Sequence, residues 1–117
     1  MNDDINIFYH NHLGIAFQWK RCDANDHKKI QLVFRDTGLL LDRKELELFS
    51  KHIEEAKNAR PLCIDCKQNE NCRALLLETP FPQLSFAVGH KELAAIGDLV
   101  NGTLFHLQLN NYLNGIL

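Results

Sequence analysis

The chain has 117 residues and a formal net charge of −2, and 45% of its residues are hydrophobic while 24% are charged. This length predicts a single domain, residues 1–117, and the apolar content argues against a disordered chain. The near-neutral charge supplies no basic field to attract a nucleic acid or an anionic membrane, so neither is an expected partner.

The N-terminal residues and the lengths of the apolar runs indicate where in the cell the protein is expected. Met1-Asn2-Asp3-Asp4 is acidic and polar, whereas a secretory signal is basic and then apolar. No apolar run approaches the roughly 20 residues that span a bilayer. We therefore expect a cytoplasmic protein whose four cysteines are reduced or metal-bound.

Alternating patterns predict antiparallel strands in the first third of the chain. Apolar and small or polar residues alternate over 13–19, and residues 5–7 can extend this alternation upstream. Residues 30–34 alternate in the same way. A turn at 35–38 then leads into a short strand at 39–41. Each of these strands should bury one face.

A helix is predicted directly after residue 41. Asp42 can accept a hydrogen bond from the backbone of Glu45, and Glu45 can reach back to Asp42, which is a capping box. Pro61 ends the element, because the residue before a proline is pushed out of helical geometry. Apolar side chains follow the cap at spacings of three and four and form one stripe: Leu46, Phe49, Ile53 and Ala56.

The second half of the chain predicts two more strands and a second helix. Residues 73–78 contain a continuous apolar run, and residues 84–88 alternate, with a proline-rich turn between them. The last segment leaves two interpretations open, because residues 103–110 also alternate like a strand. We favour a long helix, although Gly97 and Gly102 would each weaken it by roughly 1 kcal/mol. Its apolar stripe would be Leu93, Ile96, Val100, Leu104 and Leu107.

A repeated phrase organises these elements. Residues 39–46 (LLLDRKEL) are echoed by residues 86–93 (FAVGHKEL), so a strand runs into a helix twice. The two repeat units span about 28–60 and 73–113. The predicted fold is α+β, an antiparallel sheet of about five strands with two helices on one face, in the order β-(ββα)-(ββα). Internal duplication and independent use of the same hairpin–helix arrangement both remain open.

The cysteines are the candidate metal ligands. Cys63 and Cys66 are separated by two residues, a spacing at which two thiolates can chelate one zinc ion. Cys72 lies in the same polar loop, and Cys22 lies in another. These four can form a zinc site, or one of His10, His12 and His27 can substitute. The alternative is four ordinary thiols, which often pack as small apolar groups.

Other chemistry is less favoured. A thiol redox enzyme needs its cysteine pair at a helix N-terminus, but this pair follows a helix, and Asp65 between the cysteines disfavours a thiolate. Phe17 and Trp19 could stack on single-stranded nucleic acid, but their place in the alternating pattern points to the core. Neither Ser50 nor Ser85 lies in a nucleophile elbow.

The chain also resembles a family of short bacterial proteins of unknown function. The likeness rests on Cys22, residues 30–34 and 38–41, Phe49, and later Leu84-Ser85-Phe86 with Leu93. Family members carry a cysteine pair before the second strand, and this chain has Asn25 where the partner of Cys22 would fall. The resemblance implies a small domain and no particular activity.

We therefore expect a non-enzymatic module that binds a protein or a small molecule, and the sequence leaves a homodimer open. The alternative is a zinc-binding or zinc-sensing domain built on Cys22, Cys63, Cys66 and Cys72. No other cofactor is expected. A thiol redox enzyme and a single-strand binder rank behind both.

Overall fold

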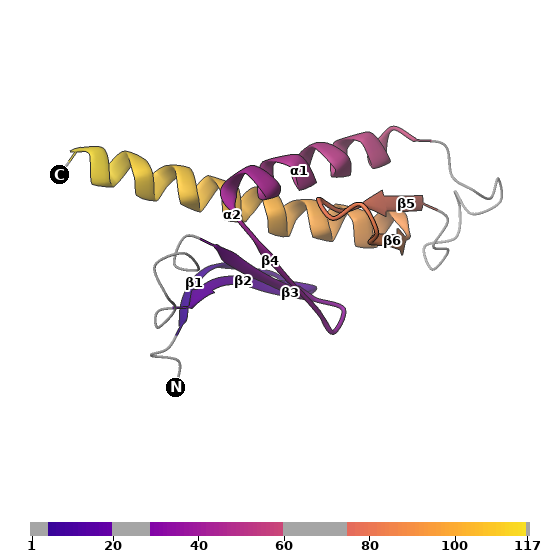
Figure 1. Cartoon of the computed structure of the whole chain (residues 1–117), viewed down its shortest axis with the longest axis horizontal. Helices are drawn as coiled ribbons and strands as arrows, with labels where there is room; N and C mark the ends of the chain where they lie inside the picture. The colour runs from indigo at the N-terminus through magenta and orange to yellow at the C-terminus, as the bar shows by residue number, and fades with distance from the viewer. Residues whose placement is uncertain (1–4, 20–28, 60–74, 117) are drawn as a thin grey trace.

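The computed structural model describes residues 5–19, 29–59 and 75–116, with side chains as far as residue 113. The fold is α+β, as expected. The elements in chain order are β1 (Ile5–His10), β2 (Gly14–Trp19), β3 (Ile30–Phe34), β4 (Thr37–Leu41), α1 (Arg43–Lys57), β5 (Leu75–Glu78), β6 (Ser85–Val88) and α2 (His90–Ile116). Helix α2 packs against α1 on one side and against β1 and β2 on the other (Figure 1).

The first four strands form an antiparallel meander in the order β1-β2-β3-β4. Residues 5–10 do not extend the strand that follows them, as the alternation suggested, but form a separate strand paired with it. The reason lies at Asn11, whose side-chain oxygen accepts hydrogen bonds from the backbone N–H groups of Leu13 and Gly14 at 2.9 and 3.1 Å. This local bonding turns the chain back on itself.

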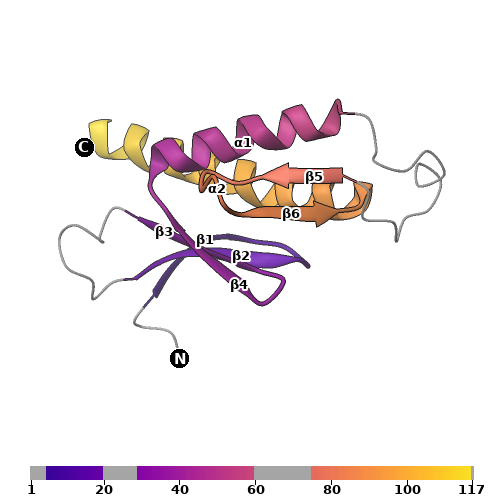
Figure 2. The same ribbon diagram turned by 45° about the vertical axis from the view of Figure 1, so that its right-hand side comes forward.

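The expectation of one five-stranded sheet is wrong. Strands β5 and β6 pair only with each other and form a second, two-stranded sheet. In Figure 2 this hairpin lies between α1 and the four-stranded sheet. The carbonyl oxygen of Ala87 in β6, which a neighbouring strand could use, instead accepts a hydrogen bond from the Arg35 side chain at 2.7 Å. The inward side chains of the hairpin are buried in the common core: Leu75, Leu77, Phe86 and Val88.

The predicted start and buried face of α1 are confirmed. The Asp42 carboxylate accepts from the Glu45 N–H at 2.8 Å, and the Glu45 carboxylate accepts from the Asp42 N–H at 2.9 Å. Both bonds satisfy donors that a helix start leaves unpaired. The four predicted stripe residues are the buried residues of this helix: Leu46, Phe49, Ile53 and Ala56.

The long-helix prediction for the last segment is also confirmed, and the strand alternative for residues 103–110 is wrong. Helix α2 continues through Gly97 and Gly102. A Cβ at Gly97 would lie 3.3 Å from the Ile53 side chain, so the glycine allows α1 and α2 to approach closely. Glycine has a low helix propensity, and contact between the two helices offsets this cost at position 97.

The repeated phrase corresponds to two strand–helix junctions, β4–α1 and β6–α2. The first helical hydrogen bond runs from Leu46 to Asp42 in one unit, at 3.0 Å, and from Leu93 to Gly89 in the other, at 2.9 Å. Both units are thus hairpin–helix units, as predicted, although their hairpins belong to different sheets. Common ancestry of the units stays a prediction.

Candidate interaction surface

The C-terminal half of α2 carries large apolar side chains on the face turned away from the core. Phe105 is 60% exposed and Tyr112 is 66% exposed. Their spacing of four and then three residues through Leu109 places them on one side of a helix. We call this set the α2 stripe, and its members are Phe105, Leu109, Tyr112 and Leu113.

The opposite face of the same helical segment is apolar as well. Leu104 and Leu107 are partly buried and pack against the core. A helix that is apolar on both faces is typical of one covered on both sides. Here the described part of the chain covers one face and leaves the α2 stripe open.

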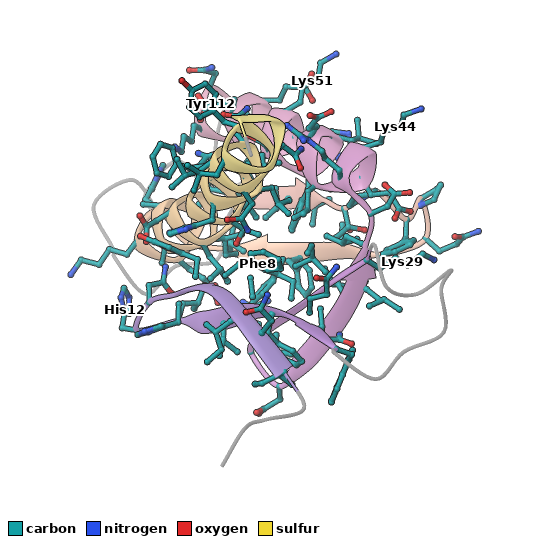
Figure 3. All side chains as sticks on the ribbon, turned by 90° about the vertical axis from the view of Figure 1, so that its left-hand side faces the viewer. Phe8, His12, Lys29, Lys44, Lys51 and Tyr112 are labelled. Atoms are coloured by element: carbon teal, nitrogen blue, oxygen red, sulfur yellow. The ribbon has the colours of Figure 1, made fainter. Side chains whose placement is uncertain are left out.

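The stripe lies where the helix leaves the body of the protein. The C-terminal end of α2 extends beyond α1 and beyond the four-stranded sheet (Figure 1). Figure 3, which looks along the molecule from that end, shows Tyr112 on the side of the helix away from the four-stranded sheet. The stripe is therefore accessible to another molecule.

This end of the helix also lacks charge. Residues 99–117 contain no Asp, Glu, Lys or Arg, and the last charged residue is Asp98. Solvated helix faces normally carry charges. The exposed polar positions here are amides instead: Asn101, Gln108, Asn110 and Asn111. An uncharged, largely apolar face favours contact with another protein over contact with water.

A cluster of polar side chains determines where α2 crosses the sheet. The Tyr9 hydroxyl lies 3.0 Å from each carboxylate oxygen of Asp98. The Asn11 amide donates to the same carboxylate at 3.0 Å and to the Ala95 carbonyl at 2.9 Å. The ring of Tyr9 lies over Gly102, and its centroid is 6.0 Å from that of His106. These contacts join the β1–β2 hairpin to α2 and so orient the stripe.

The hydrogen bond to Asp98, with burial and the nearby negative charge as smaller causes, raises the pKa of Tyr9 above its usual value. Each cause favours the neutral phenol over the phenolate. Tyr9 is therefore a hydrogen-bond donor that holds the helix, and the raised pKa is the opposite of what a tyrosine base would need.

A second candidate site is the cleft between α1 and the β5–β6 hairpin. Two adjoining hollows of about 330 and 260 Å³ share His52 and Glu78. The His52 Nδ1–H donates to the Glu78 backbone carbonyl at 3.1 Å. Two exposed leucines line the cleft, Leu48 in the larger hollow and Leu76 in the smaller one. The larger hollow is at the lower end of the sizes typical of small-molecule sites.

The proposed metal ligands cannot be placed by this structure. All four candidate cysteines, and His27, lie outside the described residues: Cys22, Cys63, Cys66 and Cys72. His10 and His12 lie at the β1–β2 turn and are exposed. Within residues 5–19, 29–59 and 75–116, no three His, Cys, Asp or Glu side chains are grouped to hold a metal ion. The zinc site stays a prediction.

The aromatic pair of β2 belongs to the folded body. Phe17 is buried, and its ring meets the ring of Trp19 edge-on with centroids 5.1 Å apart. The Trp19 Nε1–H donates to the Gln31 side chain at 3.3 Å. In the register of the sheet Phe17 lies opposite Gln31, whereas Ala16 lies opposite Leu32 and both of these belong to the hydrophobic core. Successive residues of a strand point to opposite faces, so Phe17 and Trp19 lie on the face of the sheet away from the core, and the interpretation that they face the core is wrong. Binding of single-stranded nucleic acid stays a prediction. In the part of the chain that is described, no helix is apolar over a stretch long enough to cross a membrane.

Comparison of the chain with protein-family models, with curated proteins and with solved structures finds no match.

The α2 stripe is a functional candidate that reasoning on the sequence missed. Two signals were present: the spacing of Phe105, Leu109 and Tyr112, and the lack of charge after Asp98. Neither signal was used, because the apolar stripe that includes Leu104 and Leu107 was sufficient to predict the helix and its buried face.

Proposed function

We propose that this protein is a non-enzymatic interaction module that binds another protein through the α2 stripe. The observation that carries the proposal is the exposure of Phe105, Leu109, Tyr112 and Leu113 on an uncharged helix end that extends from the body. Exposed apolar patches of several hundred Å² on small soluble domains commonly mark binding surfaces.

The chemistry of the stripe suits a protein partner. Tyrosine and phenylalanine are enriched in the central parts of protein interfaces, where a few aromatic residues contribute most of the binding energy. Burial of apolar surface contributes roughly 25 cal/mol per Å², and an aromatic side chain can bury roughly 150–250 Å². Phe105 and Tyr112 are more than half exposed, so burial of their remaining apolar surface by a partner would contribute to the binding free energy.

The polar groups of the described residues support a structural rather than a catalytic role. The Ser50 hydroxyl donates to the side chain of Asn101 at 2.8 Å and so joins α1 to α2. His52 donates to a backbone carbonyl. Tyr9 and Asp98 hold the helix on the sheet. Each of these groups is engaged in joining one element to another.

Photo-crosslinking in cells tests the proposal. A photoreactive phenylalanine analogue replaces Leu109 in the stripe, and the matched control places it at Lys44, which is exposed on α1. The proposal predicts a discrete protein adduct from position 109 that is absent from position 44. An equal pattern from both positions, or no adduct from position 109, contradicts it.

A further inference from the structure

We infer that the partner of the α2 stripe is a second copy of this chain, with the C-terminal halves of two α2 helices packed antiparallel. The inference rests on the proposed function, because it names the partner of the same surface. Its evidence is the charge, the spacing and the position of the stripe.

The lack of charge is compatible with a second copy as the partner. Residues 99–117 carry no Asp, Glu, Lys or Arg, so the surface offers no charge pattern by which to select a charged partner. The same lack of charge means that two copies bring no like charges together. The polar positions beside the stripe are amides, which both donate and accept hydrogen bonds and can therefore pair with their own kind.

The spacing suits a seam between two helices. Phe105, Leu109 and Tyr112 follow at four and then three residues, which is the alternation of core positions in a coiled coil. In a two-fold interface, each contact between two positions occurs twice with the copies exchanged. Leu109 lies at the middle of the stripe, so we place it at the two-fold axis. Phe105 of one copy then packs against Leu113 of the other.

The position of the stripe permits this pairing without collision. Because the end of α2 extends beyond α1 and the four-stranded sheet, an antiparallel pair places the two folded bodies at opposite ends of the seam (Figure 1). A standard stable interface buries roughly 800 Å² on each partner. The stripe consists of four large side chains and is smaller than such an interface, so we expect a weak dimer whose population depends on protein concentration.

Analytical ultracentrifugation of the purified full chain, from low to high micromolar concentration, tests the inference. We expect the mass to rise with concentration from one chain to two. Leu109→Glu should remain at the mass of one chain throughout. At the lowest concentration, where the wild type is also one chain, the two should have the same melting temperature. The matched control is Leu76→Glu on β5, where the leucine is 55% exposed but lies outside the stripe, and this variant should dimerise like the wild type.

A charge-pair experiment tests the place of the axis. Leu109→Glu and Leu109→Lys should each be monomeric alone, and an equal mixture should recover the dimer, because position 109 meets itself across the axis. If Leu109→Glu fails to fold, Tyr112→Glu replaces it as the monomeric variant.

The inference is overturned by a wild type that stays monomeric throughout, by a dimer that survives the glutamate in the stripe, or by a mixture of charge variants that stays monomeric. The crosslinking result separates the two proposals. An adduct of twice the chain mass at position 109 supports both proposals. An adduct of another mass with a monomeric wild type leaves the proposed function standing and removes the second copy. No adduct and no dimer removes both.

Discussion

The ring of Tyr9 fills the space that a side chain at Gly102 would need. A Cβ at Gly102 would lie 2.6 Å from three atoms of that ring, well inside van der Waals contact. The Tyr9 hydroxyl reaches Asp98, one turn earlier on the same helix. A single tyrosine thus joins β1 to α2 through two groups, its ring and its hydroxyl. The α2 stripe begins directly after these contacts in the chain.

Gly102→Ala should destabilise the protein. Alanine gains roughly 1 kcal/mol over glycine in a helix, but an extra methyl in a filled site typically costs about 1–3 kcal/mol. We expect the free energy of unfolding in urea to fall. In a Tyr9→Ala background the ring is gone, and Gly102→Ala should instead raise the free energy of unfolding. A rise in both backgrounds would show that the ring does not occupy this space.

Tyr9 should ionise above the ordinary value of its side chain. The hydrogen bond to Asp98 is the largest cause, followed by burial and by the charge of the carboxylate. Absorbance at the phenolate wavelength is measured against pH for the wild type and for Tyr9→Phe, and the component lost in the variant should titrate above about pH 10. Asp98→Asn should lower the pKa of this component, and an unchanged value would contradict the assignment.

The sign of the stability effect follows from the same shift. The pKa of Tyr9 is higher in the folded chain than in the unfolded chain, so the folded state holds the phenol proton more tightly. The stabilisation is fully present below about pH 10 and is lost as pH rises through the folded pKa. The difference in unfolding free energy between wild type and Tyr9→Phe should therefore shrink above that pH. A constant difference would contradict the linkage.

Asp36→Gly should stabilise the protein. Arg35 and Asp36 form the β3–β4 turn with φ of 56° and 57°, the left-handed region that glycine adopts without strain. Asp36 is exposed, so glycine there should raise the free energy of unfolding by about 1 kcal/mol. Chemical denaturation measures the change, and a loss of stability would contradict the strain argument.

Arg35→Gly is the matched variant at the other turn position, and it should destabilise the protein. The Arg35 guanidinium donates to Glu92 at 2.8 Å and to the Ala87 carbonyl at 2.7 Å, and it lies over the ring of Phe86. Hydrogen bonds to charged groups contribute about 1.5–3 kcal/mol, which exceeds the relief of backbone strain. The change in the free energy of unfolding should therefore be positive for Asp36→Gly and negative for Arg35→Gly. Changes of the same sign would contradict this account of the turn.

The zinc alternative predicts about one equivalent of metal in protein purified without a chelator. Zinc content measured by elemental analysis should fall on Cys63→Ser or Cys66→Ser, because each removes a thiolate ligand. The control is His90→Ala, an exposed histidine at the start of α2 that is not among the candidate ligands, and it should leave the zinc content unchanged. Less than about a tenth of an equivalent in the wild type, the level expected of contamination, contradicts the alternative.

The individual elements were predictable because their signals are local. The capping box of Asp42 and Glu45 and the stripe through Leu46 and Ile53 depend on residues a few positions apart, and the structure confirms them. The same is true of the repeated strand–helix phrase. Residues close together in the sequence determine the hydrogen bonds within one turn. They also determine the periodic patterns of helices and strands.

Contacts between distant residues decided the rest. The β5–β6 hairpin forms a sheet of its own, and the Ala87 carbonyl accepts from Arg35, 52 residues earlier in the chain. The glycine at position 102 is explained only by the ring of Tyr9. The sequence by itself determined most of the helices and strands, although it left residues 103–110 open between the two, and it determined that residues 99–117 are uncharged and rich in apolar side chains. Only the tertiary structure decided which apolar face packs on the core and which, the α2 stripe, is left open, because that depends on where the other elements end.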